Sequence, residues 1–260
     1  MRPPQSASTP DRSYPGSDLT RRSLRSIPDA NGHARCQNCA RHSFCAFSQG
    51  DVPALTTRRY RAGEFIIHQG DARPHLLLLC QGLCLITSLT EDGEEVVLHA
   101  CGSTGILDLS GWLAGSMASS ISARALVDSV VATIPSQELE TWVRGDSTWT
   151  RALLRHIGWQ MRMVEERLRW QSARDASARI MHGLLELLGI LGVRAEKDVI
   201  LPRSVSQAVL AQFLGLRRET LSRTLARMHR LRILKYQKGR ITFPNPSQIA
   251  LAMRRKFPTP

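Results

Sequence analysis

The sequence contains no long run of apolar residues. Its longest candidate is the five-residue stretch from Leu76 to Cys80, whereas a helix that crosses a membrane needs about 18 consecutive apolar residues. The residues that follow Met1 also include no apolar stretch of the kind that forms the centre of a secretory signal. These absences predict a cytoplasmic protein that has no membrane partner.

The sequence also lacks the short motifs that mark common enzyme active sites. It has no P-loop, no glycine-rich dinucleotide-binding loop, no His-Glu-x-x-His pair and no informatively spaced pair of carboxylates. These absences disfavour an enzyme, so we expect a protein that acts by binding.

Positive charge is concentrated in the C-terminal part of the 260 residues. Residues 1–150 carry 13 basic and 15 acidic side chains, whereas residues 151–260 carry 22 basic and 7 acidic ones. The apolar content of 42% is sufficient for real hydrophobic cores. A nearly neutral part joined to a strongly basic part predicts a sensing module coupled to a module that binds a polyanion, most often nucleic acid.

The N-terminal part divides into a tail and a β-rich domain. Residues 1–35 include five prolines and six serines but few large apolar residues, so we expect a flexible tail. Residues 58–140 instead show short apolar runs separated by turn residues such as Gln81-Gly82 and Glu91-Asp92-Gly93, which predicts an antiparallel β domain. The runs are Phe65–Ile67, Leu76–Cys80, Leu83–Ile86, Val96–Leu98 and Val130–Val131.

A helix is predicted from about residue 147 to residue 171, within a segment at 141–172. Its apolar residues recur at alternating intervals of three and four, which places them on one face of the helix. The arginine and glutamate residues, including Arg167 and Arg169, are therefore expected on its other faces. This apolar seam can pack on the chain's own β domain or on a second copy of the chain. Its residues are Leu154, Ile157, Met161, Val164 and Leu168.

The final segment, residues 173–260, has the pattern of a winged helix-turn-helix domain. A helix is expected over about 173–191. In the following run, Ala211 allows two helices to approach closely and Gly215 supplies the turn. Residues 233–237 and 240–243 then form a basic hairpin around Lys238-Gly239. An ordinary pair of packed helices is the alternative, but the local charge and the hairpin favour DNA binding.

The second helix of this motif carries the candidate base-reading side chains. Arg218, Glu219, Ser222 and Arg223 lie at helical intervals that place them on one face. Arginine can bind guanine, glutamate can accept from cytosine N4, and serine can contact several bases. A surface salt bridge between Glu219 and Arg223 is the alternative for that pair. On the hairpin, Lys235, Lys238 and Arg240 are candidates for phosphate contacts or for charges that protect an edge strand.

Several runs together resemble the CRP/FNR superfamily of bacterial transcription regulators between about residues 61 and 243. They are Ala62–Asp71, Gln81-Gly82, Glu91–Glu95 and the run Arg218-Glu219-Thr220-Leu221-Ser222-Arg223. The resemblance implies an α+β protein with a β-roll sensor, a long dimerisation helix and a C-terminal winged helix. It also implies a homodimeric activator that binds a DNA palindrome and acts with RNA polymerase.

Within that family, two parts of the sequence indicate different branches. Glu219, Ser222 and Arg223 are similar to the FNR branch, which implies TTGAT-type half-sites, whereas Arg218 is more like the CRP side. The cyclic-nucleotide-binding members use an arginine to neutralise the phosphate. The corresponding residues here, 106–110 and 119–122, contain no arginine, which argues against a cyclic nucleotide because a buried phosphate needs a paired charge.

Three cysteines stand in a segment at residues 36–57. Cys36, Cys39 and Cys45 form a Cys-x2-Cys-x5-Cys run, and three thiolates within ten residues can bind one soft metal centre. A zinc site completed by His33 or His42, or a redox disulfide, is the alternative. The spacing resembles the N-terminal ligands of FNR proteins, which implies a [4Fe-4S] oxygen sensor.

The fourth ligand of such a cluster is not evident in the sequence. The position that the family resemblance assigns to it holds Ala132, which cannot bind iron. We therefore take Cys101, expected in a turn beside Gly102, as the first substitute, and expect Cys80 and Cys84 to be buried hydrophobes. A regulator gated by a small effector, by haem or by thiol redox chemistry without a cluster is the alternative function.

Overall fold

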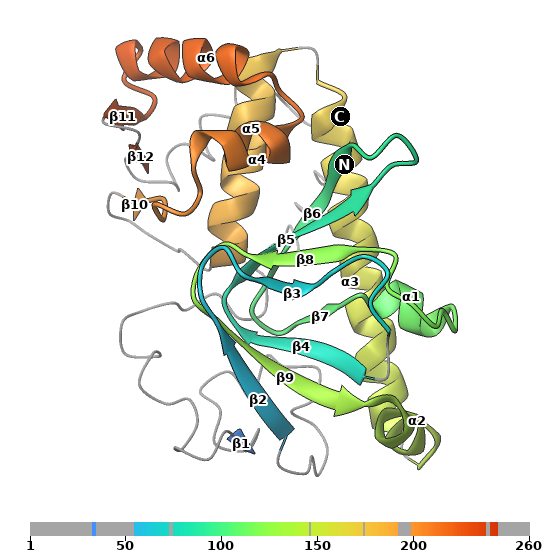
Figure 1. The fold of residues 1–260 in the computed structure, drawn as a ribbon. Helices are drawn as coiled ribbons and strands as arrows, with labels where there is room; N and C mark the ends of the chain where they lie inside the picture. The colour runs from blue at the N-terminus through green and yellow to red at the C-terminus, as the bar shows by residue number, and fades with distance from the viewer. Residues whose placement is uncertain are drawn as a thin grey trace, which may run out of the picture.

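The structure is a computed structural model, and it describes residues 33–34, 55–72, 75–145, 147–173, 175–191, 199–237 and 240–243. Two antiparallel sheets form the N-terminal half, and helices cover their outer faces (Figure 1). None of the helices within these ranges is both long and apolar enough to cross a membrane.

The two sheets form a β-roll, as the sequence predicted. The first has the order β1 (His33–Ala34), β2 (Leu55–Tyr60), β9 (Ser129–Pro135), β4 (His75–Gln81) and β7 (Gly105–Leu107). The second has the order β3 (Phe65–Ile67), β8 (Ser122–Ala125), β5 (Leu83–Leu89) and β6 (Glu95–Gly102). Every apolar run that the sequence analysis identified in residues 58–140 lies in one of these strands.

The interior of the roll lies between the two sheets. Leu79 and Val131 of the first sheet pack there with Ile86 of the second. At the turn between β4 and β5, Gly82 has a φ of 129°, and a Cβ atom added to it would lie 2.1 Å from Ser129 Oγ. Only glycine fits this position without strain, because side chains rarely adopt that φ and no space is available for one.

Helices α1 (Leu109–Leu113), α2 (Ser136–Gly145) and α3 (Ser147–Gln171) pack on the outer face of the first sheet. Trp149 and Leu153 of α3 and Leu139 of α2 are buried there against Leu76 and Leu78 of β4. Helix α3 occupies residues 147–171, as predicted from the apolar spacing.

Two side chains of α3 bind the main chain of the edge strand β7. The N–H of Ile106 donates to His156 Nε2 over 3.2 Å, and Gln160 Nε2 donates to the Ile106 carbonyl over 3.3 Å. Burial lowers the pKa of His156 to about 4, so the ring is neutral near pH 7 and its nitrogen can accept. Helix α3 is thereby fixed to the roll at a backbone position.

The C-terminal elements form a unit that packs on the second sheet. They are α4 (Ala176–Leu191), β10 (Val199–Ile200), α5 (Gln207–Leu214), α6 (Arg218–Arg230), β11 (Lys235–Gln237) and β12 (Arg240–Phe243). The unit contacts the sheet through α4 and α5. Leu85 and Val97 of that sheet share a core with Leu184 of α4. A Cβ atom added to Gly102 would lie 2.4 Å from Ile190 Cγ2, so α4 approaches β6 as closely as a glycine permits. The roll therefore packs on α3 with its first sheet and on α4 with its second.

One short strand corrects the expectation that residues 1–35 lack fixed structure. His33 and Ala34 form β1 and pair with Thr56 and Leu55 of β2, whereas residues 1–32 lie outside the described ranges. The chain therefore leaves and re-enters the first sheet on either side of the segment that carries Cys36, Cys39 and Cys45.

Candidate nucleic-acid interface

Helices α5 and α6 form the predicted helix-turn-helix. The hydroxyl of Ser206 accepts from the N–H of Val209 over 3.3 Å and caps the start of α5. Gly215 ends the helix in the left-handed conformation, with φ 61°, which glycine adopts without steric cost. Ala211 is buried between the helices, as its small size predicted.

The side chains of α6 divide into a buried face and an exposed face. Leu221, Leu225 and Met228 are buried in the core of the C-terminal domain. Among the candidate base readers, Arg218, Glu219 and Arg223 are exposed, and Thr220 and Ser222 are half-buried. The predicted readers therefore lie on the part of the helix that DNA can reach.

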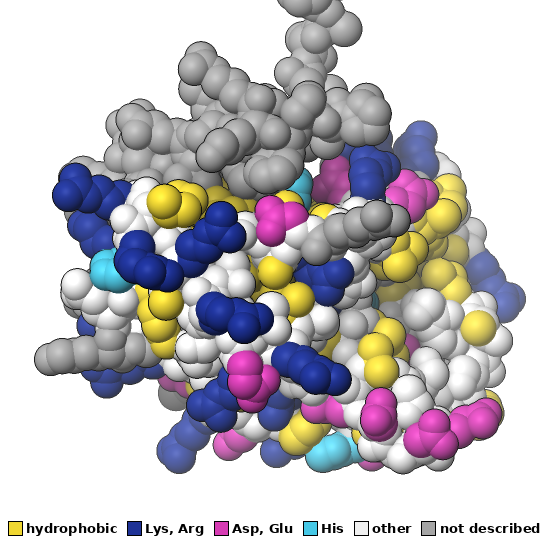
Figure 2. Space-filling view, turned by 90° about the horizontal axis from the view of Figure 1, so that it is seen from above, with side chains coloured by type: hydrophobic (Ala, Val, Ile, Leu, Met, Phe, Trp, Pro, Cys, Tyr) yellow, Lys and Arg dark blue, Asp and Glu magenta, His cyan; other side chains and the backbone are white. Residues whose placement is uncertain are grey.

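Two further arginines extend the basic face of α6. Arg227 and Arg230 are exposed, and Arg227 lies one helical turn beyond Arg223. Neither was predicted from the sequence, although their intervals of four and seven residues from Arg223 were a usable signal. Figure 2 shows lysine and arginine side chains gathered on the side of the molecule where α6 lies in Figure 1. Such a surface favours binding to phosphates.

Glu219, the acidic residue among the candidate base readers, forms no salt bridge with Arg223 in the described part of the chain. Two ion pairs between side chains are found within the described ranges, Arg144 with Glu140 and Arg167 with Glu186. The alternative of a Glu219–Arg223 salt bridge therefore finds no support there, and the carboxylate of Glu219 can accept a hydrogen bond from a base.

The wing is anchored to both helices of the motif. Strands β11 and β12 pair with Lys235 opposite Thr242 and Gln237 opposite Arg240. The side-chain amide of Gln207 on α5 donates to the hydroxyl of Tyr236 on β11. The Tyr236 N–H donates to His229 Nδ1 on α6 over 3.3 Å. Lys235 and Arg240 are exposed beside α6, whereas Lys238 lies outside the described residues.

The predicted cluster ligands fall largely outside the structure's described part. Cys36, Cys39 and Cys45 lie in the segment for which nothing is described. Within the described residues, no group of three or more potential metal ligands is present. The thiol chemistry of the three N-terminal cysteines fits three corners of an iron–sulfur cluster.

The placement of Cys101 in a turn was wrong. Cys101 lies inside strand β6, directly opposite Cys84 of β5, and 3% of its surface is exposed. Burial raises the pKa of the Cys101 thiol to about 12, whereas iron binding requires a thiolate. This environment suits a small buried hydrophobe, so the position disfavours Cys101 as the fourth ligand.

A small cavity opens in the roll beneath α1. Its volume is about 100 Å³, and its polar lining includes Asp71, His75, Asp108 and Ser119. The Ser119 hydroxyl donates to Asp108 Oδ2 over 2.5 Å. Among the described residues, the cavity lining contains no arginine, and its two carboxylates, Asp71 and Asp108, would face a bound cyclic phosphate. The described part of the lining therefore provides no guanidinium to pair with a cyclic phosphate.

Comparison with known families matches both halves of the chain. Residues 57–146 match the profile of the Cyclic nucleotide-binding domain. Residues 178–251 match that of the Crp-like helix-turn-helix domain. The first match agrees with the β-roll. The second agrees with the α5–α6 motif and its wing.

Curated relatives of the chain are regulatory proteins. The Transcriptional activator protein Anr of Pseudomonas protegens is 24% identical over 228 residues, which cover 85% of this chain and 93% of that protein. The Global nitrogen regulator of Synechococcus elongatus is 21% identical over 204 residues, which cover 78% and 91% of the two chains. The first of these names describes a transcriptional activator and the second a regulator of nitrogen.

Among solved structures, FixK2 from Bradyrhizobium japonicum has a similar fold. The TM-score is 0.63 at 22% sequence identity, and the match covers 76% of this chain and 96% of FixK2. The arrangement of roll, long helix and winged helix therefore occurs in an experimentally determined structure.

Proposed function

The chain belongs to the CRP/FNR family of DNA-binding transcription regulators, and from this premise we propose that it is an oxygen- or redox-responsive activator. In this proposal it binds an FNR-type palindrome as a homodimer, reads each half-site with α6 and recruits RNA polymerase. Cys36, Cys39 and Cys45 hold an iron–sulfur cluster. The chain is a regulator and not an enzyme.

The observation that carries the dimer is an apolar stripe on α3, defined as Leu154, Met161, Val164 and Leu168. These side chains are exposed by 61%, 59%, 42% and 64%. Ile157, the fifth predicted seam residue, is partly buried on the first sheet. An apolar stripe of this kind is stabilised by packing against a second helix, and a second copy of α3 supplies one.

A dimer also meets the geometric need of DNA recognition. Two recognition helices must lie about 34 Å apart to enter successive major grooves on one face of the duplex. One α6 contacts one half-site, so specific binding to a palindrome requires two copies held at that separation.

We expect Met161→Glu to disrupt the dimer, because two carboxylates would be buried at the centre of the stripe. Sedimentation of the purified protein should show a monomer, and binding to a palindromic duplex should weaken. Leu113→Glu is the matched control, since Leu113 is 50% exposed on α1 and lies outside the stripe. A Met161→Glu protein that sediments as a dimer would contradict the proposed interface.

The topology offers a path from the cysteines to α3. The segment that carries them begins after β1 and ends before β2, which pair with each other at the edge of the first sheet. Leu55 of β2 is buried in the same core as Trp149 and Leu153 of α3. A change that displaces β2 would therefore alter the packing of α3, the helix that carries the apolar stripe.

The cluster is tested by metal analysis and visible absorption of protein purified without oxygen. A [4Fe-4S] cluster supplies a redox-active, oxygen-labile centre when it is bound. We expect iron, sulfide and visible absorption in the wild type, and none of these in a protein with Cys→Ser at positions 36, 39 and 45. Cys101→Ser is expected to keep the cluster, because its thiol is buried in β6. A colourless, iron-free wild type would overturn the cluster proposal.

The cavity in the roll supports a second candidate function, a regulator gated by a small effector. Its volume of about 100 Å³ admits only a small molecule, so haem is excluded from it as it stands. The triple Cys→Ser protein separates the two candidates. An unchanged oxygen response in that protein would favour an effector and remove the cysteines from sensing.

A further inference from the structure

A buried arginine stands where the long helix meets the helix-turn-helix. Arg167 lies in the last two turns of α3, and 3% of its surface is exposed. The sequence analysis had placed it on an outer face of that helix. Burying a guanidinium is costly unless nearby groups pair with its charge. The partners of Arg167 therefore show which parts of the protein its side chain connects.

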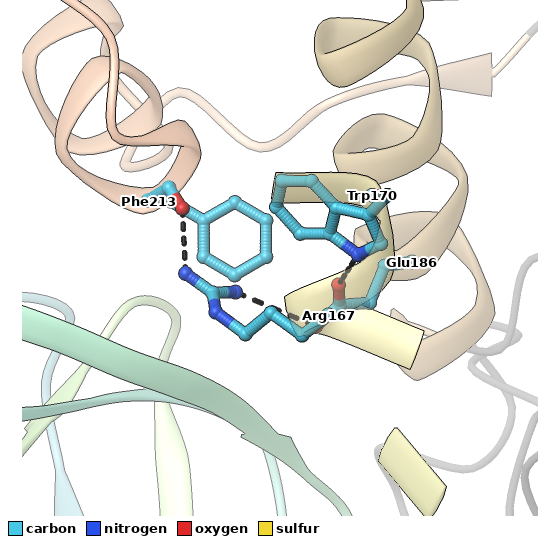
Figure 3. A network of polar contacts seen from close by, with 4 residues as sticks. All are labelled: Arg167, Trp170, Glu186 and Phe213. Carbon is cyan, nitrogen blue, oxygen red and sulfur yellow. Dashed lines mark hydrogen bonds and ion pairs between the residues drawn. The ribbon is translucent and has the colours of Figure 1, made fainter. Parts of the chain in front are cut away.

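The partners of Arg167 come from three helices (Figure 3). Its Nη2 donates to the carbonyl of Phe213 on α5 over 2.6 Å. Its Nη1 lies 3.7 Å from Glu186 Oε1 on α4. Its guanidinium lies 4.3 Å from the ring centroid of Phe213 and 5.2 Å from that of Trp170. The indole N–H of Trp170 donates to Glu186 Oε2 over 3.0 Å, which orients the carboxylate.

The Phe213 carbonyl belongs to the end of α5, two residues before the turn at Gly215. The last carbonyls of a helix have no partner within it and carry the negative end of its dipole, so a cation is favourable there. Arg179 of α4 adds a second contact, since its Nη1 donates to the Gly215 carbonyl over 3.3 Å. The turn of the DNA-binding motif is therefore held by two arginines that lie outside it.

The spacing between α4 and α5 leaves little freedom at the same place. A Cβ atom added to Gly183 of α4 would lie 2.2 Å from Leu214 Cδ2 and 3.3 Å from Phe213 Cε1. The two helices are thus in close contact beside the Arg167 site, and a rotation of α5 would have to break the hydrogen bond from Arg167.

The arginine also lies beside the proposed dimer interface. Leu168 follows it directly and Val164 precedes it by one turn, and both belong to the exposed apolar stripe. The same turn of α3 therefore faces the partner copy on one side and fixes the helix-turn-helix on the other.

We infer that Arg167 is a positioning residue for DNA recognition: it ties the turn between α5 and α6 to α3, and so sets the separation of the two recognition helices in the dimer. This inference rests on the proposed function, because it needs a dimer that reads two half-sites. It adds a residue that touches no DNA but determines which spacing between half-sites is bound.

The test compares duplexes that differ only in the spacer between two inverted TTGAT half-sites. The variant is Arg167→Met with Glu186→Gln, which removes both charges and leaves neutral side chains of similar volume. Arg169→Met is the matched control, since Arg169 is exposed on the same helix. Dissociation constants are measured for the preferred spacer, for spacers lengthened by about one and about five base pairs, where about ten make a full turn, and for a single half-site.

We expect the wild type and Arg169→Met to lose about tenfold or more in affinity when the spacer is changed. The double variant should lose that discrimination and bind all spacers within about twofold, while its affinity for the single half-site stays within about twofold of the wild type. Retained discrimination would overturn the inference. Equal loss on the single half-site and on the palindromes would also overturn it, because that result indicates general damage to the domain.

A milder variant covers the case in which the double variant does not fold. Trp170→Phe keeps an aromatic ring beside Arg167 but removes the N–H that orients Glu186. It should reduce spacer discrimination by an intermediate amount, and unchanged discrimination would again overturn the inference. A wild type that prefers no palindrome over scrambled DNA would instead refute the proposed function, so the two failures are distinguishable.

Discussion

Acidification below neutral pH should destabilise the folded chain, because two histidines are buried in their neutral form. His99 lies on β6 and His156 on α3. The pKa of each ring is lowered to about 4, for His156 by burial and for His99 by burial together with the positive charge of Arg167. In the unfolded chain both return to about 6.5. Glu186 opposes them, since burial raises its pKa to about 7 although Arg167 lowers it.

The sign follows from the protons that each state binds. Between about pH 4.5 and 6.5 the unfolded chain binds two more protons at the histidines, and the folded chain binds one more at Glu186. From these three groups the unfolded state therefore gains about one proton net, and His182, whose pKa is also lowered by burial in the folded chain, adds to this gain. The free energy of unfolding should fall by about 1.4 kcal/mol for each unit of acidification, or about 3 kcal/mol across the window.

Urea unfolding at several pH values between 7 and about 4.5 measures this slope. His156→Gln keeps a neutral acceptor for the Ile106 N–H and removes one titrating group, so it should reduce the slope by about 1.4 kcal/mol per pH unit. Glu186→Gln should make the slope about twice as steep. His68→Gln is the control at an exposed histidine. A His156→Gln protein with the wild-type slope would refute this reasoning.

Two further pairs of substitutions test the DNA interface and the roll. Arg223→Ala should cost about 1–3 kcal/mol on the cognate duplex and little on scrambled DNA, whereas Arg227→Ala should weaken both alike in fluorescence binding assays; equal losses for Arg223→Ala would exclude base reading. Gly82→Ala should lower the free energy of unfolding by more than about 1 kcal/mol, because its φ is 129° and a Cβ atom would meet Ser129 Oγ. Gly93→Ala has a φ of 78° but no atom within 4 Å of the added Cβ, so urea unfolding should show a smaller loss, and equal losses would contradict the steric argument.

Much of the fold could be predicted because local patterns and long-range packing agree. The strands follow apolar runs between turns, and α3 follows the interval of its apolar residues. The helix-turn-helix was predictable from Ala211 and Gly215, since a small residue and a left-handed turn are local requirements of that motif. Here the sequence signal and the three-dimensional constraint arise from the same residues.

Predictions failed where a residue's role depends on a distant element. Cys101-Gly102 has the composition of a turn, but both residues lie in β6. The glycine is needed there for packing, because Ile190 of α4 occupies the space that a side chain at position 102 would take. Arg167 has the spacing of an exposed helix position, but α4 and α5 bury it. Neither partner is near in sequence, so no local pattern could reveal these contacts. The strand formed by His33 and Ala34 is a similar case, because it exists through pairing with β2.

The hydrogen bonds of His156 and Gln160 with the main chain of Ile106 also affect the tendency of the protein to aggregate in a crowded solution. The strand β7 is the last of its sheet, and an open strand margin invites another chain to add itself by main-chain pairing. At Ile106 both the outward N–H and the outward carbonyl are already satisfied by side chains of α3. The long helix thus covers this edge at Ile106 and disfavours the addition of another chain there.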